Sequence, residues 1–83
     1  MVIHGRVQGV FFRDSMCRMA QSRGVRGWVR NNPDGTVEAV FEGEADAVEA
    51  MLRFSGEGPS GAAVARVEEV EEQPEDLEGF RIA

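Results

Sequence analysis

The spacing of apolar residues changes several times along this 83-residue chain, and this alternation restricts the fold more than any other feature. Residues 2–7 contain three β-branched side chains and predict a short strand. From Phe12 the spacing becomes that of one face of a helix, and Gly24 lies where such a helix would end. The predicted helix face comprises Phe12, Met16, Met19, Ala20 and Arg23.

The next segment predicts a β-hairpin. Residues 25–31 read as a strand, and the sequence NPDG at 32–35 is typical of a turn, because proline presets φ and glycine tolerates positive φ. Residues 36–42 then alternate as a second strand, with one side formed by Val37, Ala39 and Phe41 and the other by Glu38, Val40 and Glu42. Two strands joined by a tight turn should pair with each other.

A second helix is predicted after the hairpin. Glu44 and Asp46 fall in its first turn, where the helix dipole favours acidic side chains. We expect its buried stripe to comprise Ala45, Val48, Leu52 and Ser55. The sequence SGEGPSG at 55–61 predicts the loop that follows.

The last part of the chain predicts two further strands separated by an acidic stretch. Residues 64–70 alternate as a strand, and the alternation slips between Val67 and Val70, which indicates a β-bulge. Seven of the eleven residues from 68 to 78 are acidic, which favours a solvated edge or loop. Residues 80–82 could form a short terminal strand.

The resulting order is β-α-β-β-α-β with an additional C-terminal strand. This order predicts an α+β, ferredoxin-like sandwich, in which one antiparallel or mixed sheet is covered by two helices. The length suits one domain, so we expect residues 1–83 to form a single domain. Enzymes, RNA-binding domains and metal carriers all use this plan, so the fold alone does not identify the function.

Charge and cysteine content narrow the possible partners and location. The formal net charge is −6, which argues against a general nucleic-acid binder. Residues 1–31 nevertheless hold six arginines and one acid, so a small anion could be attracted to that part. The single cysteine excludes an internal disulfide framework, and no apolar run approaches a membrane span. We therefore expect a cytoplasmic protein that binds neither nucleic acid nor membrane.

Other candidate sites are weaker than the basic N-terminal part. The strand at 36–42 has one aromatic residue and acidic neighbours, unlike the strand with which RNA-recognition motifs stack bases. Cys17 and Arg23 have the C-x5-R spacing of thiolate phosphatases, but they lie within the predicted helix, where the backbone amides are already bonded. A metal carrier would need a second cysteine. We interpret His4 and Trp28 as structural.

The stretch GRVQGVFFR at 5–13 contains the elements of an anion site. Glycines allow a sharp turn that directs amides into one concavity, and the loop runs directly into a helix start. No capping side chain precedes Phe12, and Arg13 offers donors that suit phosphate oxygens. The same residues also fit an ordinary tight turn whose arginine pairs with Asp14 or Asp34. The residues by themselves leave both interpretations open.

Two motifs in the chain resemble the signatures of the acylphosphatase family. The first is GRVQGVFFR, and the second is GWVRNNPDGTVEAVFEG at 27–43. The resemblance continues through AVEAML, GPSGA and the closing FRI, so that it covers nearly the whole chain. The predicted order of helices and strands agrees with the fold of that family.

The resemblance implies hydrolysis of acyl phosphates to a carboxylate and inorganic phosphate, without metal or cofactor. It assigns the phosphoryl group to Arg13 and to the loop amides, and the attacking water to Asn31. The phosphate-binding loop would comprise Arg6, Val7, Gln8, Gly9 and Val10, while Phe11 and Phe12 would pack and position. The expected partners are a small-molecule acyl phosphate and inorganic phosphate, and the expected state is a monomer. The alternative is a non-catalytic, regulatory module that binds phosphate.

Overall fold

A computed structural model describes residues 1–71 and 73–83, and it confirms the predicted order of helices and strands. The elements are β1 (Val2–Arg6), α1 (Phe12–Ser22), β2 (Arg26–Asn31), β3 (Val37–Glu42), α2 (Ala45–Glu57), β4 (Ala63–Glu68) and β5 (Phe80–Ile82). Neither helix of the described residues is long and apolar enough to cross a membrane.

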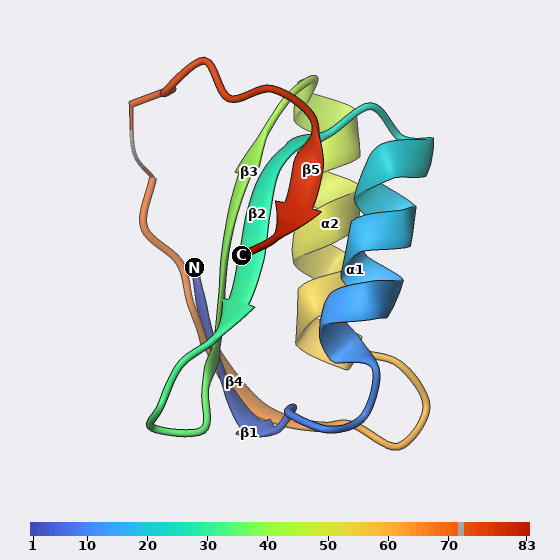
Figure 1. Cartoon of the computed structure of the whole chain (residues 1–83), viewed down its shortest axis with the longest axis vertical. Coiled ribbons are helices and arrows are strands. Elements are labelled where there is room, and N and C mark those ends of the chain that lie inside the picture. The colour runs from blue at the N-terminus through green and yellow to red at the C-terminus, as the bar shows by residue number, and fades with distance from the viewer. Residues whose placement is uncertain (72) are drawn as a thin grey trace.

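The five strands form one mixed sheet in the order β4-β1-β3-β2-β5, and both helices lie against the same face (Figure 1). Neighbouring strands are antiparallel except for β2 and β5, which run parallel. The core lies between the sheet and the helices. Its buried side chains are Ile3, Val7, Phe12, Met16, Ala20, Val25, Val29, Val37, Ala39, Met51 and Phe80. This is the ferredoxin-like α+β fold.

The first helix and the hairpin follow their sequence patterns closely. Phe12, Met16 and Ala20 are buried, whereas Arg23, the last member of the predicted face, is exposed after the end of α1. The β2–β3 turn closes with a hydrogen bond of 3.1 Å from the Gly35 N–H to the Asn32 carbonyl oxygen, and Gly35 has a φ of 92°. The turn thus uses its glycine as the sequence predicts.

The predicted buried stripe of α2 is confirmed at Ser55 and wrong at its other three members. The residues buried from this helix are Ala50, Met51 and Ser55, whereas Ala45 is exposed. Phe54 packs edge-on against Phe12, with ring centroids 5.7 Å apart, and this contact helps to orient the helix. The other two predicted members, Val48 and Leu52, are half-buried and line a hollow beside β3 instead of the core.

The bulge lies in a different place from the one predicted. β4 ends at Glu68, and the register shift lies where His4 and Gly5 of β1 face Arg66 and Val64. Gly5 has a φ of 129°, and a Cβ atom there would lie 2.1 Å from the Ala63 carbonyl oxygen. Glycine at position 5 therefore permits the close approach of β1 and β4, so its main role is in the sheet and not in the loop that follows.

The acidic segment crosses from β4 at one edge of the sheet to β5 at the other (Figure 1). Its described residues form no helix or strand between 69 and 79, and Glu72 lies outside the described residues. Glu42 of β3 accepts hydrogen bonds from the backbone N–H groups of Glu75 and Leu77, at 2.6 and 2.9 Å. These donors, Glu75 first, hold the pKa of Glu42 below its ordinary value. The segment is thus attached to the sheet.

Candidate active site

The loop between β1 and α1 turns by means of two residues with positive φ. Gly9 has a φ of 74°, and nothing would contact a Cβ atom placed on it. Its glycine is therefore required by the backbone conformation and not by lack of space. Phe11 has a φ of 61° and a ψ of 24°, the left-handed conformation that a phenylalanine adopts only at a cost in free energy. The loop therefore has a strained backbone conformation at Phe11, unlike an ordinary relaxed turn.

The start of α1 leaves its first backbone N–H groups without a side-chain cap. Phe11 occupies the N-cap position and has no side chain that could accept a hydrogen bond, as the sequence predicts. Its carbonyl oxygen accepts the first helical bond, 3.0 Å from the Ser15 nitrogen. The uncapped donors and the positive end of the helix dipole therefore favour an anion at this position.

Arg13 lies beside these uncapped donors, in the first turn of α1. Within residues 1–71 and 73–83, no carboxylate forms an ion pair with its guanidinium. Asp14 pairs instead with Arg18, at 2.7 Å, and Asp34 accepts hydrogen bonds from Thr36. The interpretation of Arg13 as the partner of Asp14 or Asp34 is therefore wrong. Its donors remain available to a bound anion.

Asn31, the last residue of β2, lines the same pocket as Arg13. The pocket has a volume of about 370 Å³, and Figure 1 shows the start of α1 and the end of β2 at the same end of the molecule. The Oδ1 atom of Asn31 is buried and has no hydrogen-bond partner among the described residues. A buried acceptor without a partner is costly, so the site suits a water molecule or a ligand that donates to it.

Gln8 joins the loop to the turn that follows Asn31. Its Nε2 atom donates to the carbonyl oxygens of Asn32 and Thr36, at 2.8 and 3.0 Å. These bonds connect the loop before Arg13 to the β2–β3 turn, although β1 and β2 are not neighbours in the sheet. The side chain of Gln8 thus positions the two walls of the pocket relative to each other.

Charged residues on the hairpin hold the turn in place. Asp34 accepts hydrogen bonds from the hydroxyl and backbone N–H of Thr36, and these keep the pKa of Asp34 below its ordinary value. Glu38 accepts from Arg30 at 2.9 Å and from Asn32 at 3.2 Å, and the bond from Arg30 contributes most to the lowered pKa of Glu38. These carboxylates are occupied by the hairpin, so they support the turn beside the pocket and do not line it.

The pocket brings together some of the residues expected at the site and adds others. Val7, Gly9, Arg13 and Asn31 line it, together with Phe11, Phe12, Asp14 and Ile82. Arg6 pairs with Ala63 in the sheet and is exposed, while Val10 packs against the core. The expectation that Phe11 packs is wrong, because 78% of its surface is exposed.

Ile82 and Asp14 were not expected at the site. Asp14 follows Arg13 directly, so the sequence could have indicated it. Ile82 depends on the parallel pairing of β5 with β2, which sets Ile82 beside Val29, two residues before Asn31. The alternation of Phe80 and Ile82 around Arg81 was the available signal, but it did not identify the neighbouring strand.

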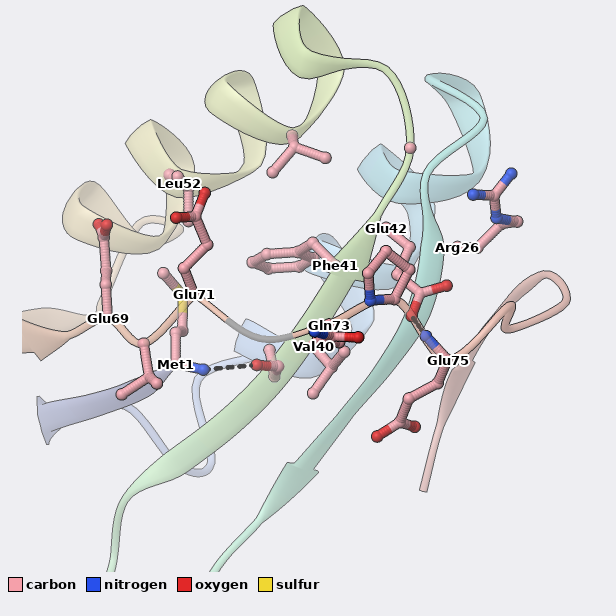
Figure 2. A pocket seen from close by; sticks show the side chains of 15 residues that line it. Met1, Arg26, Val40, Phe41, Glu42, Leu52, Glu69, Glu71, Gln73 and Glu75 are labelled. Carbon is pink, nitrogen blue, oxygen red and sulfur yellow. Dashed lines mark hydrogen bonds between the residues drawn. The ribbon is translucent and has the colours of Figure 1, made fainter.

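A larger hollow of about 670 Å³ lies beside β3 and has different chemistry. Figure 2 shows Phe41 of β3, Leu52 of α2 and residues of the acidic segment around it. Its carboxylates include Glu42, which is bonded to the backbone of that segment. None of the residues expected at the active site lines this hollow. Among the described residues, no group of three or more His, Cys, Asp or Glu side chains could hold a metal ion.

Comparisons with known proteins agree on one family. The family model for acylphosphatase matches residues 1–82. An acylphosphatase from Thermococcus kodakarensis is 59% identical over 80 residues, which cover 96% of this chain and 88% of that relative.

Solved structures give the same result. An acylphosphatase from Coxiella burnetii matches with a TM-score of 0.93 and 40% identity, covering 99% of this chain and 86% of the other. An acylphosphatase from Bacillus subtilis also matches with a TM-score of 0.93, at 31% identity, covering 99% and 92%.

Proposed function

Since the chain belongs to the acylphosphatase family and hydrolyses acyl phosphates, we propose that Arg13 and the β1–α1 loop hold the phosphoryl group while Asn31 positions the attacking water. The observation that carries the proposal is a single pocket lined by a guanidinium without an ion-pair partner in the described chain and a buried amide oxygen without a hydrogen-bond partner there. In this proposal the guanidinium of Arg13 stabilises negative charge on the phosphoryl oxygens, and the amide oxygen of Asn31 orients the attacking water.

The loop amides are the second part of the proposed phosphate site. In this proposal they comprise the backbone N–H groups of residues 6–10 together with the donors at the start of α1, which no side chain caps. We assign the phosphoryl oxygens to these donors, with Gly9 providing the conformation in which the loop amides converge. Gln8 keeps the loop at a fixed distance from the strand that carries Asn31.

The proposed reaction needs neither a metal nor a strong base. Water attacks phosphorus, the bond from phosphorus to the acyl oxygen breaks, and the carboxylate leaves with the electron pair of that bond. An asparagine amide cannot remove a proton at neutral pH, so the proton of the water moves to a phosphoryl oxygen and gives inorganic phosphate. A carboxylate is a good leaving group, so positioning and charge stabilisation supply the catalysis. We expect EDTA to leave the rate unchanged.

The replacement Asn31→Ala tests the proposed roles separately. It should lower kcat for acetyl phosphate about 10²- to 10³-fold, the usual cost of losing one oriented polar group. Inorganic phosphate should still raise the Tm of this variant, because ligand binding to the native state raises Tm and Arg13 is intact. Gln73→Ala removes an exposed amide of the acidic segment and is the matched control. Normal turnover by folded Asn31→Ala would refute the role of Asn31.

The non-catalytic alternative is not favoured, because the relatives named above are acylphosphatases. A phosphate-binding module would also have no use for a buried amide oxygen beside the anion. It predicts a phosphate-dependent rise in Tm without release of phosphate from an acyl phosphate, so one hydrolysis assay distinguishes the two functions.

We further propose a cytoplasmic monomer that binds neither nucleic acid nor membrane. The net charge of −6 opposes binding to a phosphate backbone. Cys17 is a free thiol with its Sγ 3.6 Å from the Phe80 carbonyl oxygen, which is consistent with a reducing compartment. Cell fractionation tests the proposed location, and analytical ultracentrifugation tests the monomeric state.

A further inference from the structure

Two exposed apolar side chains line the pocket that also contains Arg13 and Asn31. Within the described residues, the large apolar side chains with high exposure are Phe11 at 78%, Val70 at 71% and Ile82 at 43%. Phe11 and Ile82 both line this pocket, although one comes from the β1–α1 loop and the other from β5. Isolated exposed apolar residues are common, but convergence of two on one polar pocket points to a ligand.

Neither packing nor backbone conformation accounts for a phenylalanine at position 11. Its ring is largely exposed, so it contributes little to the core. Its φ of 61° favours glycine or asparagine, so the backbone gains nothing from this residue. The neighbouring Phe12 is 1% exposed and provides the core contact of this part of the chain. The side chain of Phe11, which lines the pocket, is therefore free to contact a ligand there.

Ile82 is held at the pocket by the sheet. β5 pairs in parallel with β2, and Ile82 lies in register with Val29. The next residue fixes the end of the strand, because the Ala83 N–H donates to the Val29 carbonyl oxygen at 2.8 Å. The apolar surface of Ile82 thus lies close to the end of β2, where Asn31 is located.

We propose that Phe11 and Ile82 form an acyl-binding rim and that the enzyme prefers acyl phosphates with an apolar acyl group. This inference rests on the proposed function, because Arg13 and the loop amides must hold the phosphoryl end. The acyl carbon skeleton then extends from the anion site toward the rim. An aromatic or branched acyl group buries apolar surface there, whereas an acetyl or carbamoyl group is too small to bury much.

The test compares benzoyl phosphate with acetyl phosphate as substrates. Phe11→Gly removes the ring and suits the positive φ, and it should lower kcat/KM for benzoyl phosphate about tenfold, mostly through KM. The value for acetyl phosphate should fall by a clearly smaller factor, because the acetyl group buries little apolar surface at the rim. Ile82→Ser should act in the same direction with a smaller loss. Phe11→Leu should keep most of the preference for benzoyl phosphate.

Val70→Ser is the matched control, because Val70 is similarly exposed but does not line the pocket. It should leave both substrates unchanged. Equal losses on both substrates in Phe11→Gly, or no loss on either, would overturn the rim while leaving the proposed function intact. Failure of the proposed function has a different result, namely full activity of folded Arg13→Ala on both substrates. Phe11→Asn, which also tolerates positive φ, replaces Phe11→Gly if that variant does not fold.

Discussion

Two hollows among the described residues use their polar groups in opposite ways. The larger one, beside β3, has about 670 Å³ and contains carboxylates, but its buried Glu42 is already bonded to two backbone N–H groups. The smaller one has about 370 Å³ and contains a guanidinium and an amide oxygen that have no such partners in the described chain. Unused hydrogen-bonding capacity, and not volume, distinguishes the proposed active site from the larger hollow.

The largest difference between the hollows should appear when each loses an arginine. Arg13→Ala should lower kcat/KM for acetyl phosphate about 10²- to 10³-fold or more, because the charged phosphoryl oxygens lose their guanidinium partner. It should also abolish the rise in Tm caused by inorganic phosphate. Arg26→Ala, the matched change in the larger hollow, should leave both unchanged. Equal effects of the two variants would remove the distinction between the hollows.

A smaller loss of activity is expected when the smaller pocket keeps Arg13 and Asn31 but loses the hydrogen bonds of Gln8 to the β2–β3 turn. Gln8→Ala removes both hydrogen bonds to the β2–β3 turn and should destabilise the fold by about 1–3 kcal/mol. Misplacement of the loop relative to Asn31 should lower kcat/KM about tenfold or more. Gln21→Ala, which removes a 3.3 Å bond from α1 to Phe80, is the control and should leave activity unchanged. Full activity of Gln8→Ala would show that the loop is held by other contacts.

In the larger hollow, the ionisation of Glu42 should make stability depend on pH, without an effect on enzymatic activity. The pKa of Glu42 is lowered in the folded state, so its ionised form adds stability above about 4.5, the ordinary value for glutamate. That contribution is lost as the pH falls through the lower pKa of the folded state. Glu42→Gln should therefore lower Tm by a few degrees at pH 7, and the difference should shrink at acidic pH, with activity retained. A Tm difference independent of pH would contradict this role.

The smallest effect on stability is expected for an exposed residue that lines the larger hollow. Glu71 is exposed, and no hydrogen bond or ion pair joins its side chain to the described residues. Glu71→Gln should therefore change the free energy of unfolding by less than about 0.5 kcal/mol and leave activity unchanged. Urea unfolding and an acetyl phosphate assay measure these quantities. A large effect would mean that the acidic segment acts by its charge as well as through Glu42.

Local patterns in the sequence predicted the elements well because each depends on nearby residues. The β2–β3 hairpin depends on its own turn, and α1 begins at Phe12, where the apolar spacing changes to that of a helix. The α2 stripe was wrong in part because Val48 and Leu52 face a hollow beside β3, whose other wall includes the acidic segment from far along the chain. The bulge was misplaced because its cause is the approach of Gly5 to Ala63, which lies on another strand.

The candidate site was predicted in part, and the limit was again long-range geometry. Glycine, an uncapped helix and Arg13 indicated an anion site from adjacent residues. The role of Asn31 came from the resemblance to a family, since nothing local connects it with Arg13. Ile82 could not be assigned because its place depends on the pairing of β5 with β2.

The position of β5 has a consequence for the local stability of that strand. The segment that follows β4 spans the sheet from one edge to the other, so the β2–β5 pairing closes a long loop, whereas the β2–β3 hairpin closes a very short one. Long-range closure carries the greater entropic cost, and a three-residue edge strand has little to offset it. The rim contributed by Ile82 is therefore tied to the docking of a peripheral strand, whereas the donors of α1 depend on local structure. Amide hydrogen exchange should be faster in β5 than in the hairpin.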